Sequence, residues 1–353
     1  MIAEITHQVV DAAADIGVRN SQPEGIGRLV VLGDLLCWNN LGRNVVFADR
    51  RLRPRAVFGS TLYPDEDEPS QYDLDVHAIL EESAMGCVLV LNHLGTIRGF
   101  RSADLLGRRG PHAVAPTMLW SFSADVERTV LAGRRLIGSR PRSERGDGLL
   151  VSAPLDTLPE HGSIPTQRDG ERFGDVTALG VVPAPGGPLI AVGGDGTVAL
   201  APLAGDHLAS PRWEADVGFR VAALEWHRDA LWAAGPERAG PVDDYDWERL
   251  EGGGFAALDP VEGTTLVSGP LPRDVAWGTG GVAVMPFGRL LAAAGRTGGL
   301  SLIDPRHPAS GWSTDPLSAT SLGIAHMAVA GRRVVYGFNR GGYCLHSAAP
   351  RTA

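Results

Sequence analysis

The chain has 353 residues, of which 44% are hydrophobic, and a formal net charge of −9 at pH 7. This length is enough for one large domain or two ordinary ones with a sizeable core. The acidic balance argues against a nucleic-acid-binding protein, because such proteins usually carry a basic stripe that neutralises phosphates. Every basic residue among the 32 counted as Lys+Arg is arginine. This excludes pyridoxal enzymes, P-loop nucleotidases and protein kinases, since each requires a lysine.

The N-terminal sequence MIAEITHQVVDAAADIG lacks the basic start and the long apolar run of a signal peptide. No stretch reaches the roughly 18 apolar residues of a membrane span. The cysteines Cys37, Cys87 and Cys344 stand in apolar strand-like runs without a CxxC or Cys/His cluster. This indicates buried free thiols in a reducing compartment, and we expect a cytoplasmic protein that binds no membrane.

The first predicted element is a strand over residues 2–10, IAEITHQVV, although VVDAAAD also tolerates an amphipathic helix. A related apolar pattern with Val or Ile in second position then starts seven times, near residues 25, 75, 125, 175, 220, 274 and 323. Its clearest copies are DVHAIL, DVERTVL and DVTALGV, whose starts Asp75, Asp125 and Asp175 lie 50 residues apart. A fixed period of this size indicates a repeat architecture.

Each unit continues in the same order, with a second apolar strand such as PLIAVGG, a glycine turn, a third strand such as GTVALAPL, and a more polar fourth segment. This predicts a four-stranded antiparallel meander. Seven such sheets make a single all-β domain over residues 1–353, a seven-bladed β-propeller. The last unit supplies three strands, 324–331, 333–339 and 342–348. We therefore expect the strand over 2–10 to complete that blade and close the ring, which hides sheet edges.

The turn Gly193-Gly194-Asp195-Gly196-Thr197-Val198 resembles the turn between the second and third strands of WD40-type repeats, in the broad WD40/YVTN-like sense. Third strands that end in Leu258-Asp259 and Ile303-Asp304 resemble the end of such a repeat without its tryptophan. The resemblance is to a divergent bacterial member, without the GH and WD dipeptides, and covers nearly all the chain. It implies the propeller fold, and a fold alone does not imply a function.

Two sets of residues on the predicted inner strands suggest a site at the central channel. His77, Glu127 and His326 are candidates for acid–base catalysis or metal binding, with Arg28 or Arg128 to hold an anionic substrate. The alternative is that these side chains form hydrogen bonds between blades or with channel water.

Four aspartates begin inner strands and would ring one mouth of the channel, where they could bind a divalent cation such as Ca²⁺ or Mg²⁺: Asp75, Asp125, Asp175 and Asp274. Equally, each could accept backbone N–H bonds in the turn that enters its strand.

Long loops on one predicted face suggest a binding surface. Residues 63–73 are acidic, and an insertion over 236–254 joins the second and third strands of the fifth unit. This insertion carries acidic and aromatic candidates for partner binding: Asp243, Asp244, Tyr245, Asp246 and Trp247. A third loop, 138–148, offers Arg140, Arg142 and Arg145 for a carboxylate or phosphate. Each of the three is otherwise a solvated loop. Arginine-rich turns such as 49–55 gather on the opposite predicted face and could meet an acidic partner.

The sequence holds no GxSxG elbow and no Rossmann GxGxxG motif. It leaves two hypotheses of different class. The first is an interaction or scaffold module that presents its acidic–aromatic loops to a protein partner. The second is a propeller enzyme of the lyase, lactonase or isomerase type, with a small-molecule site at the channel mouth. No cofactor is evident apart from the cation that the second hypothesis would use.

Overall fold

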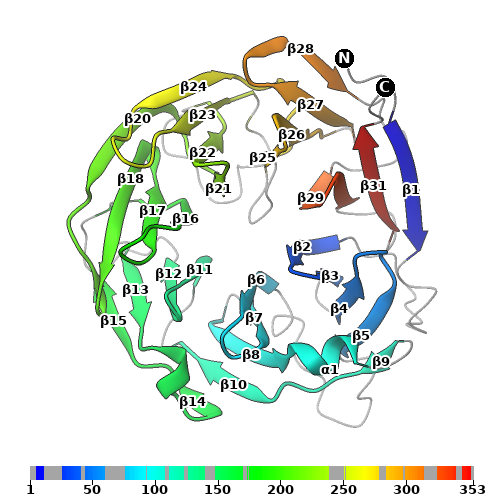
Figure 1. Ribbon diagram of the computed structural model, residues 1–353, viewed down its shortest axis with the longest axis vertical. Coiled ribbons are helices and arrows are strands. Elements are labelled where there is room, and N and C mark those ends of the chain that lie inside the picture. The colour runs from blue at the N-terminus through cyan, green and yellow to red at the C-terminus, as the bar shows by residue number, and fades with distance from the viewer. Residues whose placement is uncertain are drawn as a thin grey trace. The chain divides into compact units, whose positions relative to one another are not determined.

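The computed structural model describes residues 5–11, 26–40, 44–59, 76–92, 94–107, 111–122, 126–139, 148–169, 173, 175–237, 250, 252–277, 284–296, 299–313, 324–338 and 344–350. Strands in this part of the chain form seven sheets, four with four strands and three with five, and the strands within a sheet mostly pair antiparallel with their neighbours in the chain, as the repeat predicts (Figure 1). The chain divides into two units. Unit 1 contains Met1–Leu119, Ala294–Leu302 and Trp312–Ala353, and unit 2 contains Trp120–Ala293 and Ile303–Gly311.

Unit 1 is built on three first strands and the meanders that follow them. The first sheet contains β2 (Ile26–Leu32), β3 (Leu35–Asn40), β4 (Asn44–Asp49) and β5 (Pro54–Gly59), with the short parallel strand β9 (His112–Ala113) at its edge. The second contains β6 (Val76–Glu82), β7 (Cys87–Asn92), β8 (Thr96–Arg101) and β10 (Met118–Ser121), with the one-turn helix α1 (Ser102–Leu106) after β8. The third contains β29 (Ile324–Ala330), β30 (Arg333–Phe338) and β31 (Cys344–Pro350).

A fourth strand completes this third sheet from the other end of the sequence. It is β1 (Ile5–Asp11), which pairs antiparallel with β31 from Ile5 opposite Pro350 to Asp11 opposite Cys344. The pairing expected for the N-terminal strand is therefore confirmed, with bounds shifted from 2–10 to 5–11. The contacts of β2 with both β29 and β6 show that the first strands of successive sheets pack against one another in unit 1.

Unit 2 repeats this arrangement. Its first sheet has β11 (Arg128–Ala132), β12 (Arg135–Ser139), β13 (Leu149–Ser152) and β15 (Thr166–Asp169), and between the last two lie a 3₁₀ turn (Leu155–Thr157) and β14 (His161–Ser163). Its second has β16 (Ala178–Val182), β17 (Leu189–Gly193), β18 (Asp195–Ala204), β19 (His207–Leu208) and β20 (Trp213–Arg220). Its third has β21 (Ala223–His227), β22 (Ala230–Gly235), β23 (Gly254–Leu258) and β24 (Thr265–Pro270).

The remaining sheet is formed by β25 (Val284–Phe287), β26 (Leu290–Ala294), β27 (Leu300–Asp304) and β28 (His307–Ser313). In the described residues its first strand is β25, Val275 near the start that the sequence pattern gives forms a β-bridge, and residues 278–283 lie outside the described part. The backbone N–H of Val275 donates to the Pro272 carbonyl, and the Trp277 indole donates to Gly252. The second of these bonds attaches the segment to the residues that lead into β23 of the preceding sheet.

Apolar cores lie between neighbouring sheets. In unit 2, one cluster joins Leu200 on β18 to Leu224 on β21 and Leu231 on β22, and another joins Phe255 on β23 to Ile303 on β27. In these two clusters, side chains of one sheet are buried against the next sheet, which is the packing expected of radial blades.

Two of the predicted thiols lie in the core of unit 1. Cys37 and Cys87 are free and buried, as predicted, and the side chain of Cys344 lies outside the described residues. Burial, with a smaller contribution from Glu82, raises the pKa of Cys87 to about 11, so this thiol stays protonated at neutral pH. Within the described part of the chain, no helix is long and apolar enough to span a membrane.

Candidate functional site

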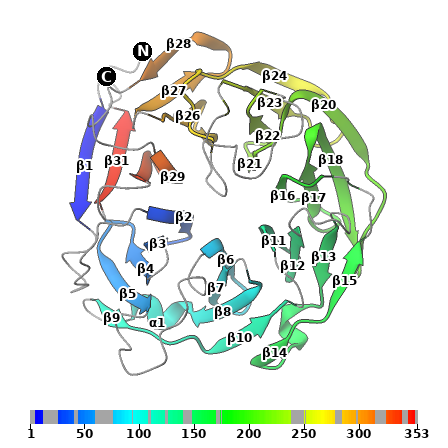
Figure 2. The same cartoon turned by 180° about the vertical axis from the view of Figure 1, so that it is seen from behind.

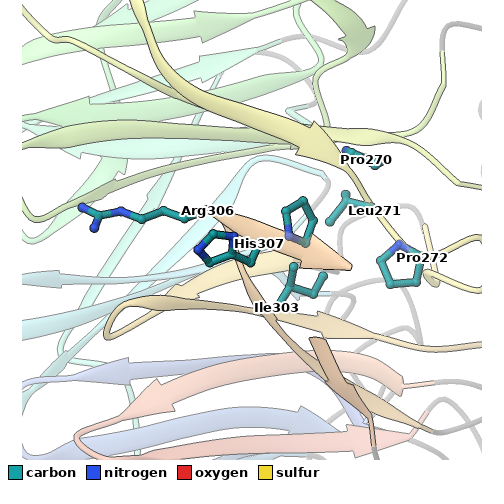
Figure 3. A pocket seen from close by; sticks show the side chains of 7 residues that line it. Pro270, Leu271, Pro272, Ile303, Arg306 and His307 are labelled. Atoms are coloured by element: carbon teal, nitrogen blue, oxygen red, sulfur yellow. The ribbon is translucent and has the colours of Figure 1, made fainter. Parts of the chain in front are cut away.

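A groove of about 730 Å³ lies in unit 2 beside the end of β24 and the start of β28 (Figure 3). Both whole-chain views show these two strands next to each other (Figure 1, Figure 2). The walls are mainly apolar, with two basic side chains at one end, and the lining residues are Pro270, Leu271, Pro272, Ile303, Arg306, His307 and Pro308. Leu271 and Ile303 form the buried floor, whereas Pro270, Arg306 and His307 are exposed.

The prolines explain why the strands leave this space. A proline has no backbone N–H, so it ends a ladder or stands at an edge. Pro270 is the last residue of β24, and the chain then continues through Leu271, whose N–H donates to the Gly253 carbonyl at 2.9 Å. On the other side, the Asp304 carboxylate accepts the Arg306 N–H at 3.0 Å, which folds the turn that brings His307 and Pro308 to the groove.

The root of the 236–254 insertion is attached to the same wall. The Gly252 N–H donates to the Arg273 carbonyl at 3.1 Å, and Leu250 packs against the cluster that contains Leu271. A Cβ on Gly253 would lie 2.1 Å from the Gly235 carbonyl oxygen, and the residue has φ +129°, so the root requires glycine there. The wall formed by 271–273 is therefore fixed by the insertion that the sequence singles out.

The binding candidates at the tip of that insertion lie outside the described residues. The same holds for the loop arginines and for the first two metal candidates. These residues are Asp243, Asp244, Tyr245, Asp246, Trp247, Arg140, Arg142, Arg145, Asp75 and Asp125. Their roles stay predictions. The groove residues, in turn, were not predicted, although the proline-rich sequences PLP at 270–272 and DPRHP at 304–308 mark both of its walls.

On the first strands of unit 2, the polar groups bridge neighbouring sheets. The Arg128 guanidinium donates to the Thr177 carbonyl at 3.2 Å, and the Thr177 hydroxyl donates to the Val221 carbonyl at 2.6 Å. Glu127 is half-buried, and its N–H donates to the Ser139 carbonyl at 2.9 Å. The Arg128 bond joins neighbouring blades, whereas the backbone bond of Glu127 lies within its own sheet, and the catalytic role of Glu127 stays a prediction.

The two described metal candidates are Asp175 and Asp274. Asp175 is half-buried and lies 3.5 Å from the guanidinium of Arg220, whereas Asp274 is exposed in the turn after β24. In the described part of the chain, no three His, Cys, Asp or Glu side chains group as a metal site. Asp175 therefore lies next to a guanidinium, and Asp175 and Asp274 do not belong to a common cluster of metal-ligating side chains.

Both histidine candidates lie in unit 1. His77 is buried at the bulge between Val76 and Ala78 on β6. His326 is half-buried on β29, which packs against β2. Burial, and then the positive charge of Arg28, lowers the pKa of His326 well below its usual value of 6.5. Its imidazole is therefore neutral at physiological pH.

Comparison with solved structures shows a β-propeller fold. A computationally designed propeller, Ika8, matches with a TM-score of 0.55 and 10% identity over 93% of this chain and 97% of the designed one. Raptor from Chaetomium thermophilum matches with a TM-score of 0.62 and 15% identity over 99% of this chain. The match spans 29% of the Raptor chain, in its WD40 propeller region. Neither a protein-family model nor a curated protein matches the sequence.

Proposed function

We propose that this β-propeller is an interaction module whose partner binds to the groove in unit 2 and to the acidic–aromatic insertion whose root is attached to the groove wall. The observation that carries the proposal is the attachment of the insertion root to the groove wall, through Gly252 to Arg273 and Gly253 to Leu271. A partner that contacts Tyr245 or Trp247 would thus be recruited next to a preformed apolar surface. Aromatic anchors next to such surfaces dominate the energy of protein interfaces.

The hydrogen bonds around the first strands also favour the interaction module over the propeller enzyme. Arg128 and Thr177 are joined to carbonyls of adjacent sheets, so their polar groups have a role in holding the blades together. The proposal also keeps the seven-bladed interpretation of the repeat, in which β1 supplies the outer strand of the last blade. The pairing of β1 with β31 supports it.

The test compares four versions of the whole chain as bait in a quantitative pull-down from host lysate. They are the wild type, Trp247→Ala, Pro270→Arg and the control Arg289→Gln. Pro270 is an exposed groove residue, and Arg289 is an exposed arginine in the β25–β26 turn outside the groove. We expect a partner that the wild type and Arg289→Gln capture equally and that both other variants lose. A hot-spot truncation costs about 2 kcal/mol or more, which corresponds to roughly thirtyfold in affinity.

The outcome that contradicts the proposal is equally defined. If all four baits capture the same proteins in the same amounts, neither the insertion nor the groove binds a partner. Circular dichroism and thermal unfolding of each variant establish that any loss of capture does not come from loss of the fold.

A further inference from the structure

Unit 2 contains another turn like the one between β27 and β28 at the groove. There an aromatic side chain from the preceding sheet covers the turn. The turn between β23 and β24 starts with Asp259-Pro260, and the Asp259 carboxylate accepts the Val261 N–H at 2.8 Å. Trp213, the first residue of β20 in the preceding sheet, lies over this turn. Its indole N–H donates to the Pro260 carbonyl at 3.1 Å, and its ring lies 2.6 Å from where a Cβ on Gly263 would stand.

The turn at the groove is built alike, but among the described residues no aromatic side chain covers it in this way. It starts with Asp304-Pro305 and has the matching bond from the Arg306 N–H to Asp304. Trp213 pairs with Leu200, and the corresponding pair in the next sheet is Val267 with Ala257. The strand position that supplies an indole at the first turn thus supplies the much smaller Val267 at the second. Gly269 and Pro308 are in close contact there, and the groove remains open beside them.

The lining of the groove defines the chemistry of what it accepts. Three of its residues are prolines, which offer ring carbons and carbonyl oxygens but no backbone N–H donors. The ionisable side chains among its lining residues are Arg306 and His307, both basic, in a chain with a net charge of −9. An occupant therefore needs an apolar side chain for the proline rings and a carboxylate for the guanidinium.

We propose that the groove binds an extended segment of a partner protein that presents an aromatic side chain next to a carboxylate. The aromatic side chain covers the Asp304–Pro308 turn as Trp213 covers the equivalent turn, and the carboxylate pairs with Arg306. Prolines and a flat aromatic ring fit together because both bury apolar surface with little loss of conformational freedom. This inference rests on the proposed function and names the class of partner that the groove selects.

A displayed library of random dodecapeptides tests the inference, because it offers the groove aromatic, acidic, basic and aliphatic side chains in every order. The library is panned on the wild-type protein after depletion on the Pro270→Arg variant, which fills the groove. We expect enriched peptides to share a Trp or Tyr with an Asp or Glu close to it. A labelled copy of the strongest peptide is then titrated against the wild type, Arg306→Gln and Arg289→Gln by fluorescence polarisation. Loss of the charged contact should weaken binding about tenfold in Arg306→Gln and leave Arg289→Gln unchanged.

Three outcomes overturn the inference. Groove-dependent peptides without an aromatic or an acidic residue would mean that the groove selects another chemistry, while the proposed function would stand. No groove-dependent enrichment would mean that the groove takes no extended segment, and the pull-down would decide separately whether a folded partner binds. Self-association of the wild type in sedimentation, abolished in Trp247→Ala, would identify the occupant as the acidic–aromatic segment of a second copy.

Discussion

The Arg55 guanidinium lies 2.8 Å from the Asp49 carboxylate in the turn that joins β4 to β5. Arg53 donates to the same carboxylate at 2.9 Å through its side chain, and the Arg51 N–H does so at 2.9 Å. Burial by itself would raise the pKa of Asp49, but these bonds outweigh it and lower the pKa to about 2. One carboxylate therefore organises a turn of arginines, in which Leu52 holds a left-handed φ of +62° and is buried.

Asp49→Asn should reduce the free energy of unfolding by about 2 kcal/mol at neutral pH, because the lowered pKa measures how strongly the folded state prefers the ionised carboxylate. The same contribution is fully present above the unfolded pKa of about 3.9 and is lost as pH falls through about 2. Urea unfolding at neutral and acid pH measures it. Asp34→Asn is the control, since its pair with Arg50 is 75% and 67% exposed and should contribute under about 1 kcal/mol. Equal losses in the two variants would contradict the prediction.

Trp213→Ala should destabilise unit 2 by about 2 to 3 kcal/mol, because it uncovers the Pro260–Gly263 turn and removes the indole hydrogen bond. Trp213→Phe keeps most of the ring contact and should cost only about 1 kcal/mol, the value of the lost hydrogen bond. Thermal unfolding of both variants measures the difference. If the phenylalanine variant is as unstable as the alanine variant, the ring does not pack over the turn as described.

Thr177→Val should cost about 1 to 2 kcal/mol, although its volume is nearly unchanged, because it leaves buried carbonyls on Gly193 and Val221 without the hydroxyl donor. Thr177→Ser retains the hydroxyl and should lie close to the wild type. Guanidinium titration of the two variants compares them directly. A stable valine variant would show that the bond between the first strands contributes nothing to stability.

His326 should make the protein less stable as the solution becomes acidic. Its folded pKa lies well below 6.5, so below about pH 6.5 the unfolded chain gains a proton that the folded chain does not. The stability is complete above the unfolded pKa and decreases as pH falls toward the folded pKa. Between about pH 7.5 and 5.5, His326→Gln should lose about 1 kcal/mol less than the wild type does. An NMR titration in which the His326 imidazole protonates near pH 6.5 would refute this.

The sheets could be predicted from the sequence because each strand is a local pattern. Val76, Val126 and Val176 are buried at equivalent places of successive units. Each unit needs an apolar residue at that place, so the pattern recurs in the sequence once per sheet. Near residue 274 the structure adds a contact that periodicity does not encode, because the Trp277 indole in the pattern DVAWG donates to the Gly252 carbonyl, 25 residues earlier.

The groove could not be predicted from the sequence in the same way. It exists because Val267, and not a tryptophan, stands where β24 pairs with Ala257, and this register becomes visible only when two sheets are compared. The clue in the sequence was the pair of Asp-Pro turns at Asp259 and Asp304, of which only the first follows a unit with a tryptophan in its fourth strand. The Arg128 and Thr177 bonds likewise cross between sheets, so sequence alone left their role open.

The pairing of β1 with β31 also bears on how the chain is synthesised. On the ribosome β1 emerges more than 300 residues before its hydrogen-bonding partner at 344–350. Until then the backbone N–H and C=O groups of β1 on that edge have no native partner, and such an edge invites pairing with a wrong strand. A nascent chain of this protein should therefore depend on chaperones that shield β1 until β31 has emerged.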